Sequence, residues 1–316
     1  MSETMESRSL YRININPAHW LMAGQRVALK ALLRLWGRNV MLYTGGVSFF
    51  ALLAAFPAVA LLIGVYSLLL TPTAALAQAD VFAQLMPPGA HALFQNELLR
   101  LAQAPIHIVS VQSAVALLIG IYAAHRGFKA LIAGLSFIHG EDEPLSFWGF
   151  NLLAFVVLVA AFALMGVLSG IFLVVRVLGA SVALNSLTGI SWFYSQWTWA
   201  SIGLSVGLTL VYRYAMSSRP VGWRASIAGG LAASLLSLAA SWASAIYVKE
   251  FSHLGAMYGS IAAVVVMLIW LSWNVNAIFF GGALATEVEL AIDEHSAQLA
   301  LRDQRGERPI ASPPGS

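Results

Sequence analysis

The chain contains no cysteine and little charge, and each shortage narrows what the protein can be. Without cysteine among its 316 residues, it has no disulfides, no thiolate metal ligands and no cysteine nucleophile. Charged residues make up only 10% of the chain, well below the roughly 25% of soluble globular domains. Hydrophobic residues make up 59%. A soluble fold could not bury that much apolar surface, so the composition indicates a membrane protein.

Signatures of catalysis and of ATP use are also scarce. The chain lacks a glycine-rich phosphate loop ending in Lys-Ser or Lys-Thr, which argues against ATP-driven pumping. A zinc site needs clustered histidines and carboxylates, whereas the seven histidines here are scattered singly. They are His19, His91, His107, His125, His139, His253 and His295. We therefore expect no enzyme, no metal site and no cofactor.

Six long apolar runs organise the chain. They cover approximately residues 45–70, 108–124, 147–175, 193–212, 225–247 and 256–283. Each is close to or longer than the ~20 residues that a helix needs to cross a bilayer. The sequence thus predicts an all-α polytopic helix bundle with six transmembrane helices within residues 41–290. The second run is the shortest, so five or seven spans remain alternatives.

Basic residues are distributed unequally around these runs, and this asymmetry orients the chain. With a cytoplasmic N-terminus, three of the 17 Lys and Arg residues lie outside, namely Arg100, Arg176 and Lys249. The other fourteen lie inside, in the N-terminal segment, at Arg126, Lys129, Arg213, Arg219 and Arg224, and in the C-terminal tail. This bias predicts cytoplasmic termini. It also explains the basic composition through contact with anionic lipid, without nucleic acid as a partner.

The segments outside the spans have distinct patterns. Residues 1–16 are expected to be flexible, without a cleavable signal peptide, and residues 17–40 to form an amphipathic interfacial helix. In that helix Arg26, Lys30, Arg34 and Arg38 form one basic stripe, which indicates an orientation anchor or, alternatively, a lipid sensor. Residues 72–107 predict an outer helical hairpin, and residues 291–316 a disordered cytoplasmic tail.

Small residues and one proline mark the expected helix contacts. Pro57 lies inside the first run, where it should bend the helix and either border a cavity or serve packing. Glycines four residues apart let helix backbones approach closely. The pairs Gly166/Gly170 and Gly203/Gly207 therefore predict packing seams, or alternatively a homo-oligomer interface.

Polar residues near the ends of the runs are candidates for binding. Arg126 and Lys129 lie one turn apart beyond the second run and could hold a phosphate or carboxylate, or simply be solvated. Arg213 ends the fourth run and is expected to snorkel, with a substrate role as the alternative. In the last run Asn274 and Asn276 are ~200° apart on a helix, so one must meet a neighbouring helix.

Two stretches of sequence resemble a known family. Residues 45–57 (GGVSFFALLAAFP) and 258–266 (YGSIAAVVV), with Gly281 and Gly282, are similar to the YihY/BrkB family of bacterial inner-membrane proteins. The resemblance implies a multi-pass protein of the cell inner membrane, in a family once labelled ribonuclease BN and linked to virulence and to lipid or solute export. The chain departs from the family at residues 135–139 and at Ala283, while Glu287 matches a family acidic position.

The leading hypothesis is a transporter or export factor that does not use ATP, with membrane lipids as partners and an anionic lipid or small molecule as substrate. Its path is expected between the first, second and last spans. Candidate path residues are Arg126, Lys129, Ser48, Pro57, Arg213, Tyr258, Asn276 and Glu287. A structural or regulatory envelope protein is the alternative. An integral-membrane enzyme ranks third, since no activated nucleophile or acid/base pair is visible.

Overall fold

The computed structural model describes residues 17–37, 40–69, 111–140, 146–181, 195–250 and 260–304. Seven helices occupy them: α1 (Pro17–Gly37), α2 (Met41–Leu69), α5 (Val111–His139), α6 (Phe147–Ser181), α7 (Gln196–Tyr214), α8 (Trp223–Glu250) and α10 (Ser260–Gln304). Six of these helices coincide with the six apolar runs. The all-α class predicted from the sequence is confirmed.

Four of the described helices are long and apolar enough to cross a membrane, namely α5, α6, α8 and α10. In α2 the apolar stretch Met41–Ala55 is too short to count as such a span. The chain is therefore a multi-pass membrane protein. Among the described residues this gives four candidate spans where the sequence predicted six, and neither α2 nor α7 is among the four.

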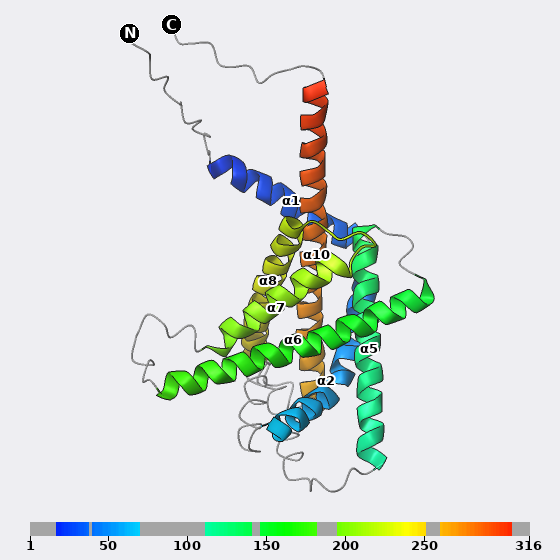
Figure 1. The fold of residues 1–316 in the computed structure, drawn as a ribbon, viewed down its shortest axis with the longest axis vertical. Coiled ribbons are helices and arrows are strands. Elements are labelled where there is room, and N and C mark those ends of the chain that lie inside the picture. The colour runs from blue at the N-terminus through cyan, green and yellow to red at the C-terminus, as the bar shows by residue number, and fades with distance from the viewer. Residues whose placement is uncertain are drawn as a thin grey trace, which may run out of the picture.

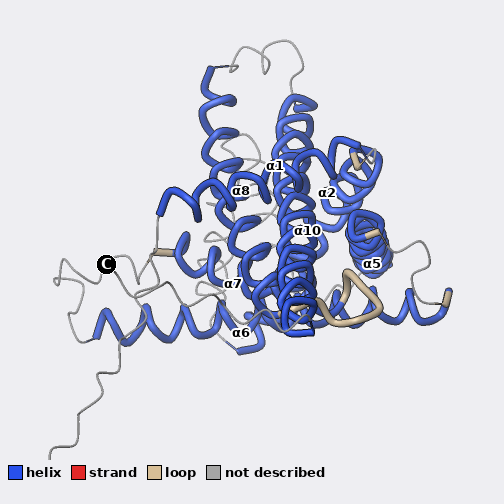
Figure 2. The backbone as a smooth tube through the Cα atoms, turned by 90° about the horizontal axis from the view of Figure 1, so that it is seen from above, coloured by secondary structure: helices blue, strands red, loops and turns tan. Residues whose placement is uncertain are grey.

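Helix α10 is the centre of the bundle. It packs against α8, α1, α2, α5 and α7, and it runs along the long axis of the molecule (Figure 1). Helix α1 crosses it near the end that also carries the last turns of α10, while α6 lies obliquely across the bundle (Figure 1). Seen along that axis, the other described helices surround α10 (Figure 2). We call the end with α1 the α1 end.

Helices α2 and α5 are joined by a glycine seam that the sequence reading missed. Gly120, Gly127 and Gly134 recur every seven residues, and a Cβ on the first would overlap the ring of Pro57. The other two lie against Phe50 and Tyr43 respectively. The α2 partners also recur at seven, in the opposite direction, so the helices are antiparallel and pack closely over several turns.

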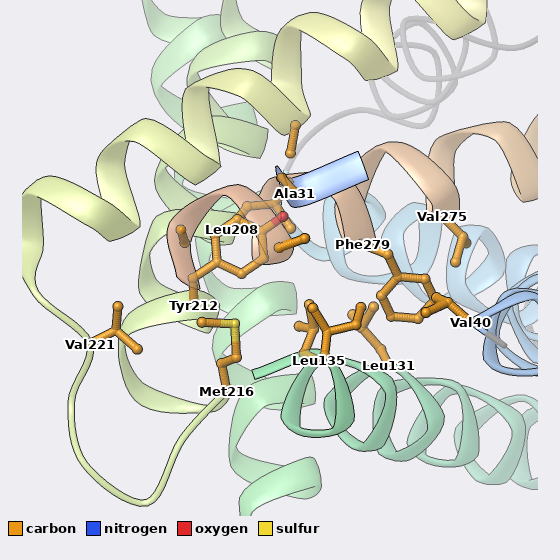
Figure 3. Close-up of a cluster of buried hydrophobic side chains, with 14 of the residues drawn as sticks. Ala31, Val40, Leu131, Leu135, Leu208, Tyr212, Met216, Val221, Val275 and Phe279 are labelled. Atoms are coloured by element: carbon orange, nitrogen blue, oxygen red, sulfur yellow. The ribbon is translucent and has the colours of Figure 1, made fainter. Parts of the chain in front are cut away.

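A second seam joins α8 to α10 and α7. A Cβ on Gly229 would overlap the carbonyl of Gly281, and one on Gly230 would overlap Thr209. The Tyr212 ring lies in the space beside these glycines, fully buried, and its hydroxyl donates a 2.6 Å hydrogen bond to the Ile278 carbonyl. Gly281 and Gly282, for which the sequence predicts a helix-packing role, lie against Ala233 and Leu135 respectively. Figure 3 shows Leu135 and Tyr212 in the core of the bundle.

The remaining predicted glycine pairs differ from one another. Gly203 and Gly207 on α7 lie against Leu168 and Leu164 of α6. A Cβ at Gly166 or Gly170 would meet no other heavy atom within 4 Å. That pair has no packing partner among the described residues.

Two helices are longer than the sequence predicted. Helix α5 continues to His139, so Arg126 and Lys129 belong to a candidate membrane span and not to an inner loop. The inner set of basic residues falls from fourteen to twelve, still against three.

Helix α10 continues to Gln304, so the expectation of a disordered tail from residue 291 is wrong as far as this residue. The predicted outer hairpin and flexible N-terminus lie outside the described residues.

Candidate functional site

Three cationic or potentially cationic side chains lie halfway along α5. His125, Arg126 and Lys129 are near the middle of the candidate span Ala114–His139. At 1.5 Å per residue, Arg126 is about 20 Å from the His139 end and about 18 Å from Ala114. The hydrocarbon core of a bilayer is about 30 Å thick, so a membrane centred on this candidate span would have these side chains in its interior.

His125 and Lys129 connect α5 to α6. The Lys129 ammonium donates a 2.8 Å hydrogen bond to Asn151 Oδ1 and lies over the rings of Phe147 and Phe150, 5.2 and 5.6 Å from their centroids. His125 Nε2 is 3.2 Å from the Asn151 carbonyl oxygen. Both residues therefore bind the first turns of α6. For Lys129 these structural contacts explain its position without a substrate.

Arg126 lies on a neighbouring face of α5 and is exposed. Its Nε donates a 3.0 Å hydrogen bond to the Tyr122 hydroxyl one turn earlier, and its guanidinium carbon is 5.5 Å from the centre of that ring. A guanidinium has five N–H donors. Among the described residues only Tyr122 bonds this guanidinium, through Nε, so none of them occupies the donors of the two Nη groups.

A compact polar junction closes the α1 end. Arg34 forms an ion pair with Glu287, with Nη2 and Nε both 2.7 Å from Oε1. The other guanidinium nitrogen, Nη1, donates to the Ile138 carbonyl at 3.2 Å. That carbonyl is one of the last in α5, which ends in Gly140 at φ 98°. Arg34 of α1 therefore neutralises the Glu287 carboxylate of α10 and donates a hydrogen bond to a carbonyl at the end of α5.

His139 belongs to the same junction. Its Nδ1 lies 3.1 Å from the hydroxyl of Thr286, which also donates to the Gly282 carbonyl. Residues 135–139, where the chain departs from the family pattern, thus meet α10 here. Glu287 is 9% exposed, and such a buried carboxylate requires a partner. Arg34 supplies it, although its place in the basic stripe of α1 had indicated a lipid-facing role.

A row of polar side chains joins α2 and α10. Thr44 Oγ1 donates a 3.0 Å hydrogen bond to Asn276 Oδ1, and Ser272 Oγ donates to Ser48 Oγ at 3.3 Å. Asn274 instead donates to the Trp270 carbonyl in its own helix. The prediction that one of the two asparagines meets a neighbouring helix is confirmed. These hydrogen bonds match four-residue spacings in two antiparallel helices.

Arg213 organises the connection from α7 to α8. Its Nη1 donates a 2.6 Å hydrogen bond to the Val221 carbonyl, and the Val221 N–H donates back to the Arg213 carbonyl at 3.1 Å. The guanidinium also stacks on Trp223, 4.2 Å from the ring centroid. These contacts give Arg213 a structural task at the end of its span.

A cavity of about 740 Å³ lies between α6 and α7 and is lined almost entirely by apolar side chains. Phe128 and Leu131 of α5 border one end, and Phe172 and Trp199 border the other. The core contact of Ile132 with Ala154 and Ala215 lies between α5, α6 and α7. Neither Arg126 nor Lys129 lines the cavity. It therefore offers space for an apolar group and no polar passage.

A sequence pattern typical of serine hydrolases occurs within α7. Residues 203–207 read Gly-Leu-Ser-Val-Gly, the letters of a serine nucleophile elbow. They lie inside α7 and not at a strand-to-helix turn, which that mechanism requires. Within the described part of the chain, no three His, Asp or Glu side chains are placed to hold a metal ion.

The structure does not gather the predicted path residues into one site. Ser48 and Asn276 lie between α2 and α10, and Pro57 lies between α2 and α5. Glu287 belongs to the junction at the α1 end. Tyr258 lies outside the described residues. Sequence reasoning missed Tyr122, Asn151 and Arg34, although the spacing of four from Tyr122 to Arg126 was a usable signal.

These features define a multi-pass α-helical membrane protein that carries basic residues within a span and an ion-paired junction at one end. Residues 31–305 match the family model described as Virulence factor BrkB. The chain belongs to this family. No solved structure matches it.

Proposed function

We propose that this protein moves an anion-bearing substrate, a lipid or a small solute, across the bacterial inner membrane without using ATP. The observation that carries the proposal is the position of Arg126 halfway along a membrane-spanning helix. A charged side chain at the centre of a bilayer costs about 2.5–3.5 kcal/mol on insertion scales. Such residues usually mark a substrate or ion pathway.

His125, Arg126 and Lys129 on α5 differ in how many partners the protein provides for their side chains. Lys129 has an amide oxygen and two aromatic rings, and His125 has a carbonyl oxygen. Within the described part of the chain, Arg126 has one tyrosine hydroxyl and no carboxylate partner. An anionic substrate would supply the missing counter-charge. We therefore assign the binding role to Arg126 and a supporting role to Lys129.

The proposal includes six spans and cytoplasmic termini. Helices α2 and α7 would complete the set begun by α5, α6, α8 and α10, since α2 is 29 residues long and α7 is 19. The twelve inner basic residues support this orientation. The last turns of α10 extend beyond the bundle on the α1 side, where they carry Asp293 and Glu294, as a cytoplasmic extension would (Figure 1).

The expected route between the first, second and last spans is closed in this conformation. The glycine seam brings α2 against α5, and Phe279 of α10 lies against Gly134. The open side of α5 is the one that carries Tyr122 and Arg126, both exposed. Substrate would move along that side.

The test is flux of anionic cargo in proteoliposomes that contain the purified full chain. Arg126→Ala should reduce flux at least tenfold, and Arg126→Lys should restore only part of it, because an ammonium cannot bind an anion bidentately. Arg219→Ala, which removes an exposed arginine from the α7–α8 connection, is the matched control and should leave flux unchanged. Full flux in Arg126→Ala would remove this residue from the site.

A second candidate is a membrane scaffold that transports nothing. The observation that favours it is the close packing of α2, α5 and α10 beside a cavity without a polar lining. If the parent protein moved no anion of either class, lipid or solute, this candidate would replace the transporter.

A further inference from the structure

The side of α5 that presents Arg126 opens sideways, towards the membrane. Val115, Leu118, Ile119 and Tyr122 are 48%, 67%, 47% and 56% exposed, and they lead along one face to Arg126. In a membrane protein such an apolar face contacts acyl chains. A substrate that reaches Arg126 from this side comes out of the bilayer and not out of water.

The guanidinium has a fixed orientation. Tyr122 and Arg126 are four residues apart, so they are neighbours on the helix surface. The hydrogen bond from Nε to the Tyr122 hydroxyl aligns one edge of the guanidinium with the helix. The two Nη groups remain together on the other edge, and a pair of parallel N–H groups matches the oxygens of a phosphate.

The described helices offer no carboxylate at this depth. Their acidic residues are Glu250 at the last residue of α8 and Glu287, Glu289, Asp293, Glu294 and Asp303 in α10. Glu287 is level with His139, because its neighbour Thr286 contacts that histidine, and His139 is about 20 Å along α5 from Arg126. From these helices a second copy of the chain would bring no partner for Arg126. A lipid phosphate remains the fitting counter-charge.

We propose that Arg126 binds the phosphate of an anionic phospholipid that enters sideways from the bilayer, while the acyl chains stay in the membrane against the exposed face of α5. This rests on the proposed transport function and names its substrate class. Phosphate in a lipid layer lies at the interface, about half of the ~30 Å core away from its centre. A phosphate held at Arg126 is therefore a headgroup on its way between leaflets.

The apolar cavity between α6 and α7 is not the chain-binding part of this site. Its lining residues on α5, Phe128 and Leu131, point to a different side of that helix, and α6 crosses α5 between them and Arg126. Lys129 is occupied by Asn151 and the α6 aromatic rings. Arg126 and Tyr122 are thus the polar side chains that this exposed face presents, among the α5 side chains that the structure describes.

The experiment compares two lipids and one soluble anion in proteoliposomes of the full chain. Fluorescent phosphatidylglycerol and phosphatidylcholine report leaflet exchange through chemical quenching of the outer leaflet, and entrapped inorganic phosphate reports solute flux. We expect the parent protein to exchange phosphatidylglycerol at least tenfold faster than phosphatidylcholine. Arg126→Ala should abolish this selectivity, Tyr122→Phe should weaken it severalfold, and Arg219→Ala should keep it.

Binding is measured separately, so that a folding defect does not decide the result. Native mass spectrometry of the detergent-solubilised protein counts retained phosphatidylglycerol, which we expect in the parent and not in Arg126→Ala. Should Arg126→Ala fail to fold, Arg126→Gln keeps a polar side chain of similar length and replaces it in both measurements.

Four results would overturn the inference. Inorganic phosphate flux that depends on Arg126, without lipid exchange, would leave the transport proposal standing and make the substrate a soluble anion. Equal exchange of both lipids would remove the headgroup from recognition. A loss of dimer in Arg126→Ala with unchanged phosphatidylglycerol retention would assign the face to a second copy. No flux of any cargo would overturn the transport proposal as well.

Discussion

At the scale of single residues, three arginines differ in what surrounds the guanidinium. Arg34 meets a buried carboxylate and a helix-terminal carbonyl, and Arg213 meets a carbonyl and an aromatic ring. Arg126 meets one hydroxyl. The first two tie helices and a connection together, although Arg213 Nε is buried without a partner, whereas the third keeps both Nη groups exposed within a candidate span. This difference separates structural from functional cations in one chain.

Loss of the junction at the α1 end should destabilise the protein. Removing one partner of a buried pair leaves an uncompensated charge, at a cost of about 3 kcal/mol for pairs as buried as this one. Arg34→Ala and Glu287→Ala should each lower the free energy of unfolding by about that amount. The double variant should lose far less than the sum, and unfolding in mixed micelles measures all three. Arg26→Ala, which removes an exposed arginine from the same helix, is the control. Strictly additive losses would show that the two side chains are not coupled.

The buried tyrosine hydroxyl should contribute measurably but modestly. Tyr212→Phe removes only the hydrogen bond to the Ile278 carbonyl. Side-chain hydrogen bonds between membrane helices are worth about 0.6 kcal/mol on average and at most about 1.7. The loss measured in mixed micelles should lie in that range. Tyr214→Phe, at a position 53% exposed, should cost nothing. A neutral Tyr212→Phe would show that the ring alone fills the space beside the glycines.

At the scale of helices, backbone contact decides which elements form the core. Helices α8 and α10 meet at Gly229 and Gly281 without side chains between them, and α2 and α5 meet through the glycine seam of Gly120, Gly127 and Gly134. Helix α6 meets Gly203 and Gly207 of α7 through leucine side chains, but its own Gly166 and Gly170 have no described neighbour where a Cβ would lie. The firm core therefore lies around α10, and α6 is the more loosely held of the described spans.

Adding one methyl group should distinguish the two kinds of glycine. Gly229→Ala forces α8 away from the Gly281 carbonyl, and overpacking of this kind costs about 1–3 kcal/mol. Gly166→Ala has room and gains helix propensity, so it should be neutral or slightly stabilising. Melting temperatures in detergent check both variants. A Gly229→Ala protein as stable as the parent would mean that the seam can widen without loss.

The positions of the helices could be predicted from the sequence because apolar runs of ~20 residues are typical of helices that cross a bilayer. It misjudged α5 because His125, Arg126 and Lys129 resembled the end of a span, whereas apolar residues continue after them until Gly140 breaks the helix. It also placed Arg34 in a lipid-facing stripe. Four-residue steps advance by ~40° on a helix, so the stripe that begins at Arg26 has turned towards the bundle by Arg34. The identity of its partner there, Glu287, depends on how the helices pack and cannot be read from the sequence of α1.

At the scale of the whole molecule, the orientation in the membrane follows from charge and can be tested directly. The chain has no cysteine, so single cysteines can be introduced without background. Cysteines replacing Asp142 and Ala300 should be protected from an impermeant thiol reagent in intact cells, because Asp142 follows α5, Ala300 lies in the last turns of α10, and both helices end at the α1 side. Cysteines replacing Asp80 and Glu250 should react. Labelling at position 142 from outside would reverse the orientation.

The central position of α10 also sets the order in which the protein can be made. Ribosomes synthesise α10 after the six described helices that precede it, yet five of those six pack against it. The faces of these five helices that contact α10 therefore stay exposed to lipid until α10 has been inserted. Assembly of this bundle is a late event in biosynthesis, and the first spans depend on the insertion machinery, or on one another, to survive the interval.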